Sequence, residues 1–201
     1  MNNSDLSGIS QITDNMYLSG IYPLEQDSIG MTNKINSLGI KYIICCVSKN
    51  HTAKVHDKLV THNPNITVLY IPLDDILQQN LWTANKNSID IKSRNMQISS
   101  YYNLYHNKPM IEIGFHFLEH VVNSRDKVLV HCMAGISRSV SLIVYYLMKK
   151  YHLDFDNALQ FVKNKRKIAN PNNSFKLQLK LYHVIRDQFC DTDADRIITQ
   201  L

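Results

Sequence analysis

A short apolar strand, a loop of small residues and an almost wholly apolar helix follow one another directly between residues 128 and 148. The strand, Val128–Val130, contains no polar residue, and the helix, Val140–Met148, is apolar on nearly every side. An element that is apolar all round has no face to offer to water, so it belongs in the interior. We therefore expect the loop between strand and helix to be fixed by the packing of two buried elements.

The rest of the chain combines further strands with further helices. Apolar runs predict buried strands at Ile40–Val47 and Thr67–Pro72, and a short strand with polar turns is expected at Ile12–Gly20. Helical spacing predicts helices at Leu24–Leu38, Ile111–Val122, Asp154–Lys167 and Ser174–Phe189. This order indicates an α/β fold with a central, mostly parallel sheet flanked by helices.

The last two predicted helices each carry an apolar face that we expect to be buried. On the first helix this face consists of Phe155, Ala158, Leu159 and Val162, and on the second of Leu177, Leu181, Val184 and Ile185.

The chain length and the absence of repeats favour a single domain. The chain has 201 residues, and no Pro- or Gly-rich linker divides it. Between Asp75 and Pro109 it is polar with little periodicity, so we expect an extended surface loop over residues 76–108.

Charge and cysteine content narrow the class of protein. The net charge of +5 is spread along the chain without the basic runs of a nucleic-acid-binding tail, so neither nucleic acid nor a membrane is expected as a partner. The cysteines do not have the spacing of a disulfide framework, and the longest apolar run is too short to span a bilayer. We expect reduced thiols in a soluble cytoplasmic protein to which the nucleus is also accessible; nothing indicates the oligomeric state.

The loop itself has the composition of a phosphate-binding site. In Val130–Ser141 (VHCMAGISRSVS), five residues separate Cys132 from Arg138, enough for successive backbone N–H groups to point inward, and a helix N-terminus follows. Gly135 permits a tight turn, and the guanidinium of Arg138 matches two phosphate oxygens. Because cations and helix N-termini stabilise a thiolate, Cys132 is predicted to be a nucleophile.

A second Cys-x5-Arg sequence shows that this spacing alone is weak. Cys190 and Arg196 lie in CDTDADR, which has no preceding strand, no glycine and three aspartates that would repel phosphate. We therefore assign the site to Cys132 only.

The segments HCMAGISRSVS, LIVYYLMKKYHLDFDNALQFVKNKR and NPNNSF resemble the active-site half of dual-specificity protein phosphatases, particularly the MAP kinase phosphatase branch. ITDNMYLSG, GIKYIICCV and YIPLDD are similar to that family's earlier segments, in the same order. The resemblance implies a protein-tyrosine-phosphatase-like domain over residues 9–189, an insertion at 76–108 and a C-terminal tail at 190–201. Two departures affect the substrate-facing surface: the longer stretch at Ile76–Lys108, and Cys45 where Asn is common.

The resemblance also implies a two-step hydrolysis without a cofactor. Cys132 attacks phosphorus to give a phosphocysteine, which water hydrolyses, while Arg138 holds the equatorial oxygens. Ser139 matches the position whose hydroxyl donates to the leaving thiolate, although Ser is also common at helix N-termini. The expected substrate-binding residues are His131, Met133, Ala134, Gly135, Ile136 and Ser137; His131 could instead only orient the loop.

The general acid is expected on YIPLDD. Asp75 matches the family position, and Asp74 is its immediate rival; both could also be ordinary loop aspartates. If neither serves, Asp90 is the next candidate.

Metal binding is not expected. His116 and His120 lie four residues apart beside Glu119, but the order is not His-Glu-x-x-His and no third ligand is evident. Cys45 and Cys46 are expected in the core, although one could in principle form a protective disulfide with an oxidised Cys132.

Substrates are expected to be proteins phosphorylated on tyrosine and on serine or threonine. RNA 5′-phosphates or phosphoinositides are an alternative, but such anionic substrates would favour basic residues inside the loop, which is neutral from Met133 to Ser137. A phospho-reader without turnover is a third hypothesis, and the presence of both Cys132 and Arg138 argues against it.

Overall fold

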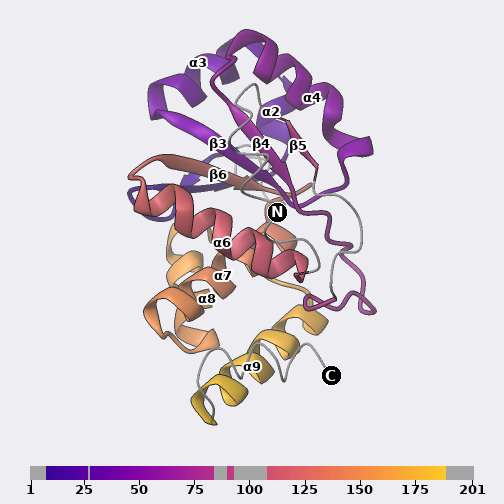
Figure 1. Ribbon diagram of the computed structural model, residues 1–201, viewed down its shortest axis with the longest axis vertical. Helices are drawn as coiled ribbons and strands as arrows, with labels where there is room; N and C mark the ends of the chain where they lie inside the picture. The colour runs from indigo at the N-terminus through magenta and orange to yellow at the C-terminus, as the bar shows by residue number, and fades with distance from the viewer. Residues whose placement is uncertain (1–7, 27, 84–89, 93–107, 189–201) are drawn as a thin grey trace.

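Within residues 8–26, 28–83, 90–92 and 108–188, which the computed structural model describes, six strands form one sheet in the middle of the protein (Figure 1). The strands in spatial order are β1 (Ser10–Gln11), β2 (Met16–Ser19), β6 (Lys127–His131), β3 (Ile40–Cys45), β4 (Thr67–Tyr70) and β5 (Ile91–Lys92). The four inner strands are parallel, whereas β1 and β5 pair antiparallel at the edges. The predicted α/β fold is confirmed.

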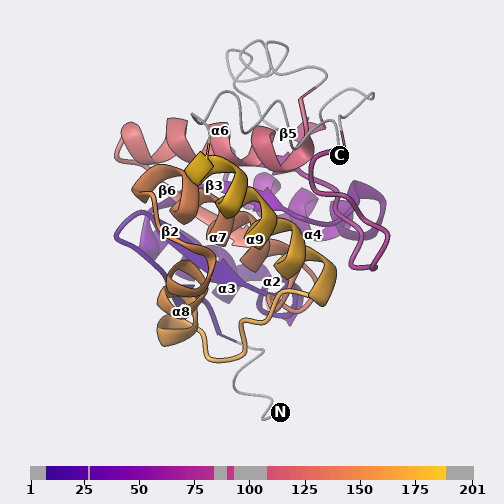
Figure 2. The same ribbon diagram turned by 90° about the horizontal axis from the view of Figure 1, so that it is seen from below.

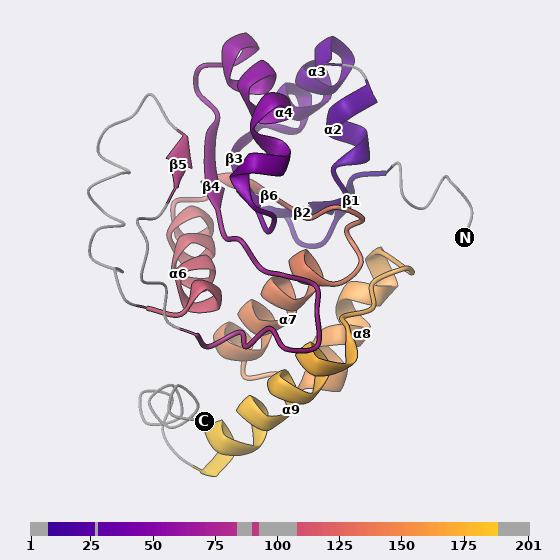
Figure 3. The same cartoon turned by 90° about the vertical axis from the view of Figure 1, so that its right-hand side faces the viewer.

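Helices cover both faces of this sheet. Those that come after β6 and the one just before it lie together on one face, where the view from below shows them in front of the sheet (Figure 2). They are α6 (Met110–Asn123), α7 (Arg138–Tyr151), α8 (Phe155–Lys165) and α9 (Asn173–Gln188). The other face carries α2 (Tyr22–Gln26), α3 (Ser28–Leu38) and α4 (Lys49–His62), and Figure 3 separates the two layers. No helix among the described residues is long and apolar enough to cross a membrane.

Helix α7 is the central helix of its layer, as the sequence predicted. Every residue from Ser139 to Met148 is buried, and the helix packs against β6, α6, α8 and α9. Helix α8 also buries its predicted apolar face, and the carboxylate of Asp154 caps its N-terminus by accepting a hydrogen bond from the Asn157 amide.

The register of the parallel strands brings four residues into one row. Ser19 and Cys45 both lie opposite His131, and Tyr70 lies opposite Cys45. These residues are at or next to the carboxyl ends of β2, β6, β3 and β4. Because the carboxyl ends of parallel strands meet at one edge, the loops that follow them come together there.

The helix expected at Leu24–Leu38 corresponds to α2 and α3, which lie on either side of residue 27, outside the described residues; α3 ends before Gly39, whose φ of +72° suits glycine. Two other elements differ from the sequence prediction. The strand expected from Ile12 begins only at Met16. Helix α4 was not predicted at all, since only Leu59 and Val60 among its buried residues are aliphatic.

The prediction of which face of α9 is buried is largely wrong. Leu177 is 71% exposed and Val184 is 51% exposed, whereas Phe175 and Leu179 are fully buried. Both sets of residues have helical spacing, so the helix carries two apolar stripes. Contact with α7 and α8 buries the stripe that contains Phe175 and Leu179, whereas the stripe that contains Leu177 and Val184 faces outward.

The polar stretch at 76–108 is described only in part. Its described portion includes strand β5 and two buried residues, Leu81 and Trp82. The Trp82 ring lies 5.9 Å from the ring of Tyr145 and 5.9 Å from that of Tyr182, measured between centroids. Leu81 and Trp82 therefore belong to the core, and Ile91 of β5 is partly buried against it.

Candidate active site

The loop from Cys132 to Ser137 connects β6 to α7, and its carbonyl groups are held from outside. The donors are the Ile21 amide to Met133 O (2.9 Å), Arg166 Nη2 to Ala134 O (3.1 Å), Arg166 Nε to Gly135 O (2.7 Å), the Asn170 amide to Ile136 O (2.8 Å) and the Ser141 amide to Ser137 O (2.8 Å). In a trans peptide the C=O and N–H point in opposite directions. With the carbonyls turned outward, the amides face the inside of the loop and can hold an anion.

Gly135 is required by the space around the loop. Its φ is +66°, and a Cβ at this position would lie 2.5 Å from the carbonyl carbon and oxygen of Ser19. Any other residue would push the loop away from β2.

The sulfur of Cys132 receives two hydrogen bonds. The Gly135 amide and the Ser139 hydroxyl each donate to Sγ over 3.2 Å. Donors aimed at sulfur stabilise a thiolate over a thiol. Burial raises the pKa of Cys45 to about 11 and that of the adjacent Cys46 well above its usual value. Cys132 alone among the described cysteines has the surroundings of a nucleophile.

Arg138 has an unused donor at the same site. Its Nη1 lies 3.5 Å from Leu73 O, and its buried Nε forms no hydrogen bond within the part of the chain that is described. The nearest carboxylate oxygen recorded for Nε is Asp75 Oδ2, at 3.7 Å. A buried donor without an acceptor costs about 1–3 kcal/mol, so a bound oxyanion would relieve this cost.

Asp75, not Asp74, has its carboxylate at the loop. Oδ1 of Asp75 accepts hydrogen bonds from Ser137 Oγ (2.7 Å) and Asn172 Nδ2 (2.8 Å). Both aspartates are exposed, and the contact recorded for Asp74 is from its amide to Gln79 Oε1. Asp90 forms an ion pair with Lys49 on α4. Of the three candidate acids, Asp75 is the one that contacts a residue of the loop.

The other predicted site residues lie either in the loop or, for His131, behind it. Met133 is exposed, and Ala134 and Ile136 are half-buried. The hydroxyl of Ser137 is engaged by Asp75 and by the Asn172 amide. His131 is fully buried, and its ring faces His56 behind the loop.

Sequence reasoning missed Arg166, Asn172 and Asn170 as individual residues. All three lie in segments that carry the family resemblance, but their roles depend on contacts with residues about 30 to 97 positions away. No local pattern could have indicated those contacts.

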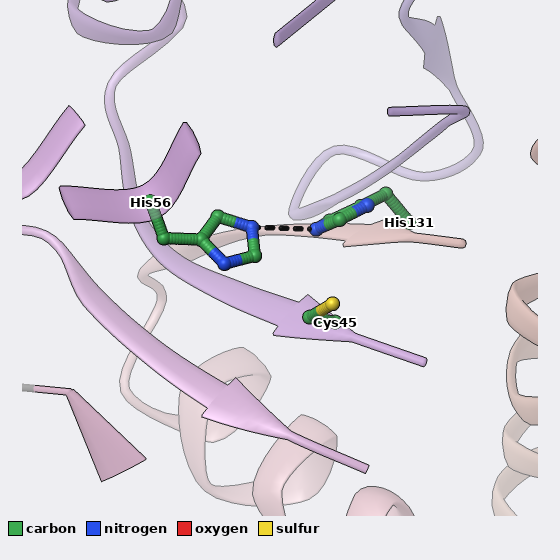
Figure 4. Close-up of side chains that lie close together, drawn as sticks. All are labelled: Cys45, His56 and His131. Atoms are coloured by element: carbon green, nitrogen blue, oxygen red, sulfur yellow. Dashed lines mark hydrogen bonds between the residues drawn. The ribbon is translucent and has the colours of Figure 1, made fainter. Parts of the chain in front are cut away.

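One cluster behind the loop has the spacing of metal ligands. Cys45, His56 and His131 each offer an atom within 4.8 Å of the others. Figure 4 shows the three side chains close together. Both imidazoles already form hydrogen bonds through Nε2. His116 and His120, where metal binding was considered from the sequence and not expected, are not part of this cluster, and His116 Nε2 lies 3.7 Å from Glu112 Oε2.

Comparison with known proteins assigns the chain to a family. Residues 21–185 match the family model of the dual-specificity phosphatase catalytic domain. The chain belongs to the dual-specificity phosphatase family. It is a cysteine-dependent phosphatase, and its substrates are phosphorylated proteins.

Two relatives support the assignment to dual-specificity phosphatases. A protein of Acanthamoeba polyphaga mimivirus assigned as a tyrosine-protein phosphatase is 44% identical over 199 residues, which is 96% of this chain and 92% of that protein. The tyrosine-protein phosphatase yvh1 of Schizosaccharomyces pombe is 30% identical over 177 residues, which is 88% of this chain and 42% of that protein.

Solved structures share the fold. The Yvh1 phosphatase domain of Chaetomium thermophilum aligns with a TM-score of 0.60 at 22% identity, covering 87% of this chain and 95% of that chain. The PTP-2 phosphatase of Cydia pomonella aligns with a TM-score of 0.61 at 21% identity, covering 87% of this chain and 89% of that chain.

Proposed function

We propose that Cys132 is the nucleophile of a two-step hydrolysis of phosphotyrosine and of phosphoserine or phosphothreonine. The thiolate attacks phosphorus, the bond to the substrate oxygen breaks, and a phosphocysteine forms that water then hydrolyses. The observation that carries this proposal is the pair of hydrogen bonds that Gly135 and Ser139 donate to Sγ.

The neighbouring residues take complementary roles. Arg138 and the inward amides of Met133–Ser139 hold the three equatorial oxygens, since phosphoryl transfer depends mainly on positioning and electrostatics. Asp75 protonates the departing oxygen, and Ser139 donates to the thiolate that leaves in the second step. Ala134, Gly135, Ile136 and Ser137 shape the loop, and His131 positions it from behind.

We further propose that the catalytic domain covers residues 9–189, with an insertion at 76–108 and a tail at 190–201. The match at residues 21–185 supports most of this span. Thiol chemistry requires a reducing compartment, so we propose the cytoplasm, with the nucleus also accessible. The free thiols of Cys45, Cys46 and Cys132 are consistent with that compartment.

Substrate trapping tests the assignment of the nucleophile. Cys132→Ser should abolish turnover of a phosphopeptide while binding is retained, because the loop amides and Arg138 remain. Cys46→Ala is the matched control, since it removes another buried thiol and should leave turnover close to that of the wild type. A Cys132→Ser variant that still hydrolyses the peptide would mean that another residue is the nucleophile.

A comparison of substrates tests which class of phosphate ester the enzyme hydrolyses. Phosphate release from phosphopeptides should greatly exceed release from triphosphate-ended RNA or phosphoinositides, because the loop offers no basic side chain between Met133 and Ser137. Faster release from either of the latter substrates would reassign the enzyme.

A further inference from the structure

The segment that follows Asp75 and helix α9 enclose a groove, which we call the α9 groove. Residues 77–80 and Trp82 form one wall, and Gln178 and Leu181 of α9 form the other. Its volume of about 260 Å³ is smaller than the roughly 300–1,000 Å³ of typical small-molecule sites. The α9 groove is therefore suited to one or two side chains of a larger partner.

The two walls of the α9 groove are held together by one glutamine. Gln178 Oε1 accepts a hydrogen bond from the Leu81 amide, and Gln178 Nε2 donates to Gln79 O, each over 2.8 Å. Trp82 is buried, and its ring stacks on that of Tyr182 with the centroids 5.9 Å apart. Because these contacts lie within the protein itself, the α9 groove is formed before a partner binds.

Exposed apolar side chains gather at the α9 groove. Leu77 is 66% exposed and Leu181 is 42% exposed, and Leu177, one turn before Leu181 on α9, is more exposed still. A contiguous group of exposed apolar side chains marks an interaction site, whereas single ones do not. The polar residues of the lining are neutral amides, so a charged side chain would lose its water there without gaining an ion pair. The expected occupant is apolar.

The α9 groove continues the active site. Leu77 is two residues after Asp75, and Asn172, which donates to Asp75 Oδ1, lies just before α9. Figure 3 shows the segment after β4 passing the start of α7 and then meeting α9. Gln178 and Leu181 lie six and nine residues after Asn172, which is roughly 9–14 Å along a helix. An extended peptide covers that distance in about three to four residues.

We propose that the α9 groove binds an apolar side chain of the protein substrate, about three or four residues from the phosphorylated residue. A phosphoprotein that reaches Cys132 lays its neighbouring residues on the surface around the phosphate loop, and the α9 groove is an apolar part of that surface. The inference rests on the proposed function, because it assigns a substrate preference to the same site.

Phosphopeptides that differ at one position test this preference. A phosphotyrosine peptide with serine at the flanking positions is compared with four versions that carry a single leucine at position −4, −3, +3 or +4. At one or more of these positions leucine should raise kcat/KM by roughly 5- to 20-fold, mainly through KM, because the side chain is bound equally before and during the reaction. Equal kcat/KM values for all five peptides would overturn the proposal.

Substitutions in the α9 groove should remove the preference. In Leu181→Gln and in Leu77→Gln, the ratio of kcat/KM between the preferred leucine peptide and the serine peptide should fall toward one. Both side chains are exposed, so both variants should fold. Phe161→Gln, which replaces an exposed aromatic residue on α8, is the matched control and should keep the ratio of the wild type. An unchanged ratio in both leucine variants would contradict the role of the α9 groove.

Trp82 provides a readout that needs no turnover, because it lines the α9 groove and is the only tryptophan in the chain. In Cys132→Ser, the preferred leucine peptide should change the Trp82 emission to saturation, and the serine peptide should leave it unchanged at the same concentration. If the wild type hydrolyses none of the peptides, the proposed function fails, and the Trp82 emission alone decides whether the α9 groove binds the leucine. No change with any leucine peptide would count against the proposal.

Two other results would assign the α9 groove to a different occupant and so overturn the proposal. One is a dimer of the wild type in analytical ultracentrifugation that becomes a monomer in Leu181→Gln, which would indicate a second copy of the chain. The other is a change in the Trp82 emission of the free enzyme when Ile197→Ser and Ile198→Ser are combined, which would indicate the last residues of the chain itself.

Discussion

The carboxylate of Asp75 is held by neutral donors and lies near the clamp arginine. Ser137 and Asn172 fix Oδ1 over 2.7 and 2.8 Å, while Oδ2 lies 3.7 Å from Arg138 Nε. The side chain is therefore oriented toward the loop. This is the arrangement expected of a group that delivers a proton to a departing oxygen.

Asp75→Asn should slow phosphopeptide hydrolysis by roughly 10²–10⁴-fold, the usual contribution of acid–base catalysis. An aryl phosphate with an acidic leaving group should be affected far less, because its oxygen departs without a proton. The high-pH limb of the rate profile should also flatten. Paired rate measurements on the two substrates give the leaving-group dependence directly.

Asp74→Asn is the matched control, since it changes the adjacent carboxylate, which has no recorded contact with the loop. It should behave nearly like the wild type. A larger leaving-group dependence in Asp74→Asn would reverse the assignment, and no dependence in either variant would move the acid to another residue, with Asp90 next.

Arg138→Lys keeps the positive charge but removes the planar pair of donors. Because an ammonium group cannot reach two phosphate oxygens in parallel, we expect turnover to fall severely. Steady-state rates on a phosphopeptide measure the loss. A rate close to that of the wild type would contradict the clamp role.

At the scale of elements, α9 offers two leucines in different surroundings on one helix. Leu179 is fully buried, whereas Leu177 is 71% exposed. Leu179→Ala should lower the free energy of unfolding by about 2–5 kcal/mol, since it leaves a cavity against the core. Leu177→Ala should change it by less than about 0.5 kcal/mol. Urea unfolding of the two variants checks the orientation of the helix, and a larger loss for Leu177→Ala would mean that it is rotated.

At the scale of the whole molecule, the buried histidines make the stability depend on pH. The pKa of His56 is lowered to about 2 and that of His131 to about 4, mainly by burial, so below about pH 6.5 the unfolded chain binds more protons than the folded one. Stability is therefore full above about pH 6.5 and falls as the pH decreases toward the folded pKa values. Each histidine should lower the free energy of unfolding by about 2 kcal/mol when the pH falls from 7.5 to 5.

Urea unfolding at both pH values measures this loss in the wild type and in His56→Gln, which has one fewer buried imidazole. The variant should lose about 2 kcal/mol less than the wild type over the same interval. An equal loss in both proteins would show that His56 is not held neutral in the folded state.

The sequence alone determined the parts of this protein that depend on neighbouring residues. Cys132, Gly135 and Arg138 lie on one continuous loop, so their spacing and composition were enough to predict a phosphate site. The burial of α7 and the inner strands also followed from local patterns, because an element with no polar face must lie inside. Conversely, α4 carries too few aliphatic residues for its pattern to be recognised.

Only the tertiary structure decided the contacts between distant segments. Asp75 is distinguished from Asp74 by Ser137 and Asn172, which are 62 and 97 residues further along the chain. The choice between the two apolar stripes of α9 depends on the helices that it meets. His56 reaches His131 across 75 residues because the parallel strands end in one row. In each case the sequence permits two arrangements, and the packing of remote elements selects one.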